Sequence, residues 1–157
     1  MKSNTNELKT LFHKSHIIPD VIARTPDNLL QVEYNGIAIN PGDVLSKNQV
    51  VQKPEIRWRP INESALYTLY LVNPDVPSRF EPYEAEWQHW TVHNIPGIQK
   101  NSGFENWIDS GDTVVEYSSE YQHPDSEGFY KTWNFLIAYL QFENVILCSD
   151  DGSNSIL

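Results

Sequence analysis

The chain has 157 residues, which fits one domain able to bury about two thirds of its unfolded surface. Hydrophobic residues make up 39% and aromatic residues 12%, which excludes a disordered or fibrous chain and favours strands, because flat rings pack well on a pleated surface. The net charge of −10 argues against a general nucleic-acid binder and against docking on anionic lipid through a polybasic patch.

The sequence also indicates a compartment. Cys148 is the single cysteine, so no intramolecular disulfide can form. Residues 1–6 lead into no apolar segment, which predicts that a secretory signal is lacking. The longest apolar run, residues 133–142, is too short to span a bilayer. We therefore predict a cytoplasmic protein with no integral membrane contact; the glycosylation sequon Asn62-Glu63-Ser64 matters only in a secreted chain.

The N-terminal part predicts a helix followed by a hairpin. Residues 7–14 place Leu8, Leu11 and Phe12 at helical spacing, with Asn4 or Thr5 as the cap, and Pro19 ends any continuation. Residues 29–34 and 37–39 read as strands joined by Asn35-Gly36, which supplies the two positive φ angles of a type I′ turn.

The rest of the chain reads as further strands. Ile56, Trp58 and Pro60 alternate with two arginines, which predicts a half-buried strand with a cationic outer face. Residues 66–72 are nearly all apolar, which predicts a central strand covered on both faces. Three more strands are expected, at residues 89–95, 113–117 and 133–142.

These elements predict an all-β fold, an antiparallel β-sandwich with a short N-terminal helix. Neither an internal repeat nor a linker-like composition divides the chain. We expect residues 1–15 to form a helix packed on the body, 16–142 to form the sandwich domain, and 143–157 to form a polar tail.

Two segments between strands could carry chemistry. By composition alone, Asn73-Pro74-Asp75-Val76-Pro77-Ser78-Arg79 is a rigid turn, because two prolines fix φ and Asp75 and Ser78 can bond to nearby backbone. The segment of residues 86–97 contains His89 and His93. On a strand, residues four apart are about 13 Å apart and cannot share a metal ion. We therefore predict no metal and no cofactor, and a structural role for His93.

These two segments resemble a known family. Residues 73–79 resemble the Asp-Pro-Asp-x-Pro-Ser-Arg signature of the phosphatidylethanolamine-binding proteins, which include the Raf kinase inhibitor proteins. Residues 86–97 resemble the family's Glu-Trp-His-His-hydrophobic segment, at the same spacing from the first motif. The resemblance covers residues 16–111 well. It implies a β-sandwich with a small anion pocket at one end that accepts phosphate-like head groups.

The resemblance also implies the pocket residues. Asp75, Pro77, Trp87 and His89 match the family's pattern. Asn73 and Tyr130 depart from it: Asn73 stands at the first aspartate of the signature, and Tyr130 at the histidine of the family's Gly-x-His-Arg motif. We expect His89 to donate a hydrogen bond and to gain charge near neutral pH beside an anion, and Trp87 to offer its indole N–H and a wall. The predicted ligand-binding residues are Asn73, Asp75, Pro77, Trp87, His89 and Tyr130.

The predicted function is therefore a non-enzymatic binding protein for a phosphate-containing or phospholipid head-group ligand. The resemblance adds a regulatory role in signalling, with a protein kinase or another signalling protein as partner. One alternative is an interaction or assembly subunit with a degenerate pocket. The other is a hydrolase using Ser78, which no Gly-x-Ser-x-Gly elbow surrounds. Because the family continues past the point matching Leu157 with another strand and helices, we expect an exposed sheet edge and a dimer formed through it.

Overall fold

The computed structural model describes residues 5–14, 16–26, 28–43, 45–60, 62–74, 76, 80–81, 83–84, 87–97, 107–119 and 136–140. The elements in chain order are α1 (Thr5–Lys14), α2 (Ile17–Asp20), β1 (Gln31–Tyr34), β2 (Ile37–Ile39), η1 (Lys47–Gln49), β3 (Glu55–Arg57), β4 (Leu66–Asn73), β5 (Trp87–Pro96), η2 (Trp107–Ser110), β6 (Asp112–Val115) and β7 (Leu136–Leu140).

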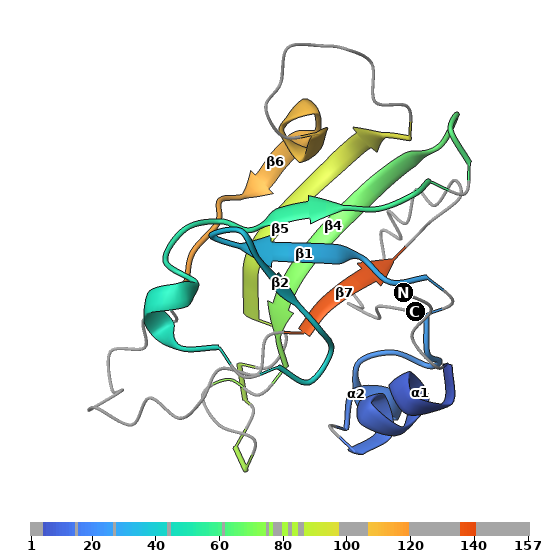
Figure 1. Ribbon diagram of the computed structural model, residues 1–157, viewed down its shortest axis with the longest axis vertical. Coiled ribbons are helices and arrows are strands. Elements are labelled where there is room, and N and C mark those ends of the chain that lie inside the picture. The colour runs from blue at the N-terminus through green and yellow to red at the C-terminus, as the bar shows by residue number, and fades with distance from the viewer. Residues whose placement is uncertain are drawn as a thin grey trace.

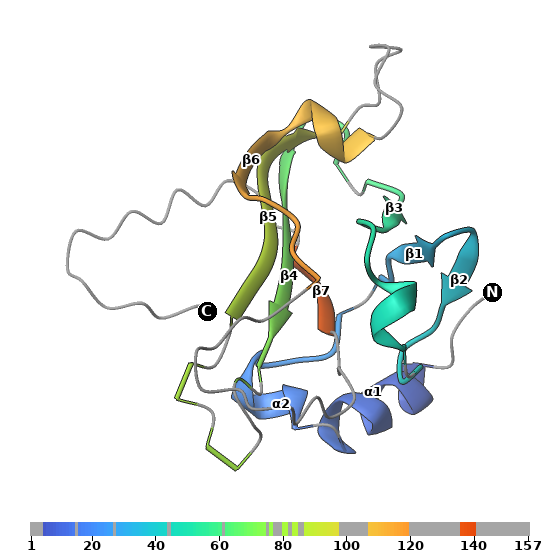
Figure 2. The same ribbon diagram turned by 90° about the vertical axis from the view of Figure 1, so that its left-hand side faces the viewer.

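Two antiparallel sheets dominate the part of the chain that the structure describes. One has three strands in the order β2-β1-β3, and the other has four in the order β6-β5-β4-β7. The two sheets face each other as two layers, with α1 and α2 at one end of the sandwich and η2 at the opposite end (Figure 1, Figure 2). The predicted all-β sandwich with a short N-terminal helix is confirmed.

The two helices pack together through apolar side chains. Leu8 and Phe12 of α1 and Ile18 of α2 form a small buried cluster, as the helical spacing of residues 7–14 predicts. The prediction that Pro19 ends the helical continuation is wrong. The first helix ends at Lys14, His16 has a left-handed φ of 57°, and α2 runs through Pro19 to Asp20, although Ile18 departs from helical geometry at φ −110° and ψ 125°. None of the described helices is both long enough and apolar enough to cross a bilayer.

The hairpin of β1 and β2 has the predicted turn. Asn35 has φ 52° and Gly36 has φ 75°, and Tyr34 pairs with Ile37 across them. The next predicted strand is shorter than expected: β3 ends at Arg57, and the Trp58 ring stacks on Trp107 with centroids 4.4 Å apart. Its outer face is not purely cationic, because Arg57 pairs with Glu55 at 2.7 Å.

Strand β4 is central, as predicted, since it pairs with β5 on one side and with β7 on the other. Its burial differs from the prediction. Tyr67, Leu69 and Leu71 are buried against the other sheet, whereas Thr68 and Tyr70 on the opposite face are only half-buried. The apolar run in the sequence therefore predicted more burial of the outer face than the structure shows. On that face, polar Thr68 and the Tyr70 hydroxyl tolerate partial exposure.

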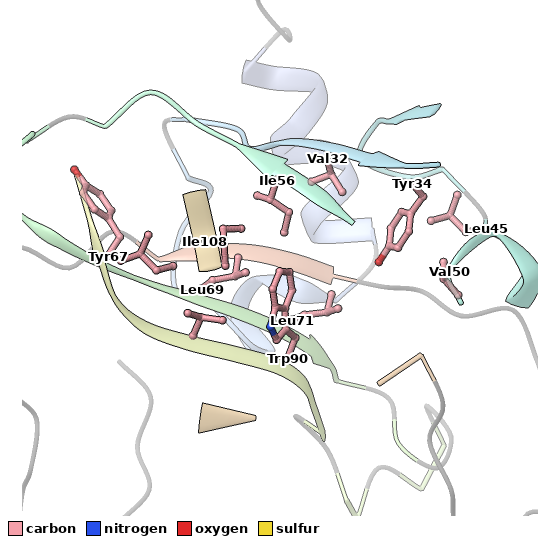
Figure 3. Packing of buried hydrophobic residues seen from close by; sticks show 12 residues of the cluster. Val32, Tyr34, Leu45, Val50, Ile56, Tyr67, Leu69, Leu71, Trp90 and Ile108 are labelled. Atoms are coloured by element: carbon pink, nitrogen blue, oxygen red, sulfur yellow. The ribbon is translucent and has the colours of Figure 1, made fainter. Parts of the chain in front are cut away.

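The core lies between the two sheets. Side chains from β1 and β3 meet side chains from β4 and β5, with Leu45, Val50 and Ile108 closing the sides (Figure 3). Val50, Leu71, Ile95 and Ile108 have no exposed surface. Burial of this apolar surface is the main favourable term that holds the two layers together.

Replacement of Leu71 by alanine should lower the free energy of unfolding by about 2–5 kcal/mol, because it removes a fully buried side chain and leaves a cavity. Leu66→Ala is the matched control on the same strand. Leu66 is 56% exposed, so the control should change stability by less than about 0.5 kcal/mol. Urea unfolding measures both, and equal losses would contradict this description of β4.

Candidate functional site

Strands β4 and β5 bring three of the predicted ligand-binding residues to one place. Asn73 ends β4, Trp87 begins β5, and the two residues are direct partners in the antiparallel register. His89 lies two residues further along β5. Paired Cα atoms in such a ladder lie about 4.5–5.5 Å apart, so Asn73 and Trp87 are close neighbours. The other predicted residues, Asp75, Pro77 and Tyr130, lie outside the described residues.

A β-bulge interrupts β5 at His89. Leu71 pairs with Trp90 and Val72 pairs with Gln88, so His89 is an extra residue with no counterpart on β4. The bulge shifts the alternation of side chains: Thr91 donates to Gln88 at 2.8 Å, a contact that requires both side chains on one face. Bulges re-aim side chains and occur often beside functional sites. The bulge thus gives the His89 side chain an orientation that the regular alternation of a strand would not provide.

His89 is tied to Ser118 by two hydrogen bonds. The imidazole Nδ1 lies 2.8 Å from the Ser118 carbonyl oxygen, and the Ser118 amide donates to the His89 carbonyl oxygen at 2.8 Å. A carbonyl oxygen can only accept, so Nδ1 carries the hydrogen. In the neutral ring the other nitrogen, Nε2, is then an acceptor. This side chain has no exposed surface.

The electrostatic setting keeps His89 uncharged. Burial lowers the pKa of His89 below its ordinary value, and the hydrogen bond to the Ser118 carbonyl opposes this shift without reversing it. Without a ligand, the imidazole is therefore neutral near neutral pH. The Nδ1 hydrogen of His89 goes to the Ser118 backbone, so donation from His89 to a ligand stays a prediction.

Ser118 was missed by sequence reasoning, because any residue type can supply a backbone carbonyl. Its position follows from Tyr117. The Tyr117 hydroxyl donates to the Val50 carbonyl oxygen, and the ring packs edge-on against Trp90 with centroids 6.0 Å apart. Tyr117 thereby fixes the segment after β6 beside the start of β5. The aromatic residue that ends the predicted strand 113–117 was the available signal.

The remaining side chains differ in exposure. Trp87 is 39% exposed, so its ring can form a solvent-facing wall, and Asn73 is half-buried. His93, on the same strand, lies with its ring edge-on to Tyr70 and its Nε2 3.5 Å from the Tyr70 hydroxyl. Among the described residues, no group of three or more His, Cys, Asp or Glu side chains could hold a metal ion.

Comparison with known proteins gives one matching family. The family model described as phosphatidylethanolamine-binding protein matches residues 25–137, which is more than half of the chain. A fold comparison finds the crystal structure of a phosphatidylethanolamine-binding protein from Plasmodium falciparum, with a TM-score of 0.47 and 22% identity, over 69% of this chain and 58% of that one.

Two curated relatives are similar in sequence. A Drosophila melanogaster protein named putative odorant-binding protein A5 is 28% identical over 126 residues, which is 80% of this chain and 56% of the relative. The 26 kDa secreted antigen of Toxocara canis is 34% identical over 87 residues, which is 55% of this chain and 33% of the relative. The chain thus spans between a third and about half of the lengths of these relatives.

The buried, neutral His89 predicts a loss of stability in mild acid. Its pKa in the folded protein lies below the ordinary value, so below about pH 6.5 the unfolded chain binds a proton that the folded chain does not. The free energy of unfolding should therefore fall between about pH 7.5 and pH 5.5.

His89→Gln should make this fall shallower, because glutamine does not titrate. His93→Gln, the matched control on the same strand, keeps His89 and should keep the part of the fall that His89 causes. Chemical unfolding of the wild type and both variants across this range measures the effect. The same slope in wild type and His89→Gln would contradict a buried neutral imidazole.

Proposed function

The chain belongs to the phosphatidylethanolamine-binding protein family, and from this membership we propose that it binds a phosphate-type anion where β4 ends and β5 begins. Family membership supports a non-enzymatic binding protein in general. The names of the two relatives, an odorant-binding protein and an antigen, support binding rather than catalysis.

The observation that carries the proposal is the register of β4 and β5. It makes Asn73 and Trp87 neighbours and places His89 two residues away on a bulge. An asparagine amide and an indole N–H are both hydrogen-bond donors suited to phosphate oxygens. Asp75, Pro77 and Tyr130 complete the proposed site on the strength of the resemblance. The proposed ligand is a phosphate-containing or phospholipid head group.

Ligand binding to the folded state must raise stability by linkage. O-phosphorylethanolamine at ten times its dissociation constant should add about 1.4 kcal/mol, or about 3–6 °C in the melting temperature of a domain of this size. His89→Ala should lose most of this shift, and the control His93→Ala should keep it. Differential scanning fluorimetry measures the shift, and none with wild-type protein at millimolar ligand would contradict a small-ligand site.

A second candidate function, an interaction subunit, is favoured by strand β6. It is an outer strand of the four-stranded sheet within the described part of the chain, and its Val114 is 62% exposed. An outer strand with an exposed apolar side chain can pair with another chain. Sedimentation velocity should then detect a dimer that Val114→Lys converts to monomer. A monomeric wild type at the highest soluble concentration would rule out this self-association.

A signalling role, a kinase partner and a cytoplasmic location stay predictions from resemblance and sequence. Kinase-inhibition assays and cell fractionation are the respective tests. Secretion is the competing outcome for location, since one relative is named a secreted antigen. In that case Asn62, which is exposed, would be the glycosylation acceptor, and a mass shift after glycosidase treatment would reveal it.

A further inference from the structure

We propose that a fully ionised phosphate monoester takes up one proton when it binds at His89, because the Ser118 carbonyl holds this histidine in the form whose Nε2 accepts a hydrogen bond. The inference rests on the proposed function above and adds the protonation state of the bound ligand. It concerns how the site distinguishes phosphate ligands that carry an O–H donor from fully ionised ligands that carry only acceptor oxygens.

The geometry of the imidazole carries the argument. The bond from Nδ1 to the Ser118 oxygen is 2.8 Å long, and the reciprocal bond from the Ser118 amide to His89 makes the pair rigid. Turning the ring over to present an N–H to a ligand would break the first bond of a side chain that has no exposed surface, which is costly. The acceptor character of Nε2 is therefore built into the fold.

An ionised phosphate ester is a poor partner for such a site. A dianionic phosphoryl group carries only acceptor oxygens, and an acceptor facing the lone pair of Nε2 is repelled. One proton from solvent removes the conflict. It resides on Nε2, which creates an imidazolium that donates from both nitrogens, or on the ligand, which creates an O–H donor to Nε2. In either case, one proton lies between a phosphoryl oxygen and His89.

Other titratable groups lie on the elements around His89. Within the described residues they are Tyr67 and Tyr70 on β4, His93 four residues along β5, Asp112 on β6, and Glu116 and Tyr117 directly after β6. His93 lies about 13 Å away along an extended strand and contacts Tyr70. Glu116 is exposed and adjacent to the Tyr117–Ser118 segment. Asp75 lies outside the described residues. Burial lowers the pKa of His89, which agrees with a neutral ring before the ligand binds.

The first test needs no ligand. Long-range proton–nitrogen correlation spectra of the whole chain with nitrogen-15-labelled histidine distinguish the two neutral forms of each imidazole. His89, assigned by its absence in His89→Gln, should show a protonated Nδ1 and an unprotonated Nε2 at about pH 7.5. A protonated Nε2 in the neutral ring would overturn the inference, whatever binds.

The second test counts protons. Calorimetric titration with methyl phosphate at about pH 8, in two buffers of different ionisation enthalpy, should give an uptake of about one proton per complex, because the second pKa of a phosphate monoester is about 6. The affinity should fall about tenfold per pH unit above about pH 7. Hydrogen phosphate carries its own O–H at this pH and should take up much less than one proton.

Variants separate His89 from its neighbours. His89→Gln should bind methyl phosphate without proton uptake, because the glutamine amide can turn its NH₂ toward the ligand. Glu116→Gln and His93→Gln should each retain an uptake of about one proton. If Glu116→Gln abolishes the uptake, the proton belongs to Glu116 and the inference is wrong.

The outcomes distinguish the inference from the function beneath it. Binding of methyl phosphate with no proton uptake would overturn the inference and leave the proposed anion site intact. Absence of binding by every phosphate compound, with unchanged His89 signals, would overturn the proposed function and this inference together.

Discussion

The antiparallel pairing of β4 with β5 is the constraint on which the rest of the structure depends. It buries Leu69, Leu71, Trp90 and Val92 on one face and thereby supplies half of the core between the sheets. The same pairing sets the register that brings Asn73 opposite Trp87. A slip of one residue in the register would turn every side chain to the other face of the sheet and expose the core. The burial of the core residues therefore also fixes the relative positions of Asn73 and Trp87.

The bulge at His89 shows how this ladder accommodates a buried polar ring. An extra residue in β5 frees His89 from the alternation of the strand, and its carbonyl oxygen accepts a hydrogen bond from the Ser118 amide. The imidazole Nδ1–H of His89 donates to the carbonyl oxygen of the same Ser118. Burying a polar ring without such a bond would be unfavourable, and burying it charged would cost more.

The two ends of the sandwich are built differently. At the end with η2, Trp58, Tyr67 and Trp107 form an aromatic cluster, in which Trp107 also donates to the Pro96 carbonyl at 2.8 Å. At the end with α1 and α2, β4 finishes and β5 begins, and exposed aromatic side chains such as Trp87 and Tyr83 are found near that junction in the chain. Contacts between aromatic rings stabilise the first end, whereas the second end is where we propose the anion site.

The sequence by itself determined the strands, the turn between β1 and β2, and the family. Alternating apolar residues and the Asn35-Gly36 pair are local signals, because backbone sterics and side-chain period act over a few residues. Two motifs of ordinary residue types identify Asn73, Trp87 and His89 as candidate ligand-binding residues through their resemblance to the family. The local sequence pattern predicted a longer β3 and a more buried outer face of β4 than the structure shows.

Only the tertiary structure decided which nitrogen of the neutral His89 ring carries the hydrogen, and which group accepts it. The Ser118 carbonyl lies 29 residues away along the chain, and its chemistry is common to every residue, so no side-chain pattern identifies it. The bulge likewise depends on how β5 pairs with β4 on one side and β6 on the other. Such long-range backbone contacts are set by the packing of whole strands. For this reason the sequence identifies His89 as a candidate residue but does not show which of its ring nitrogens is protonated.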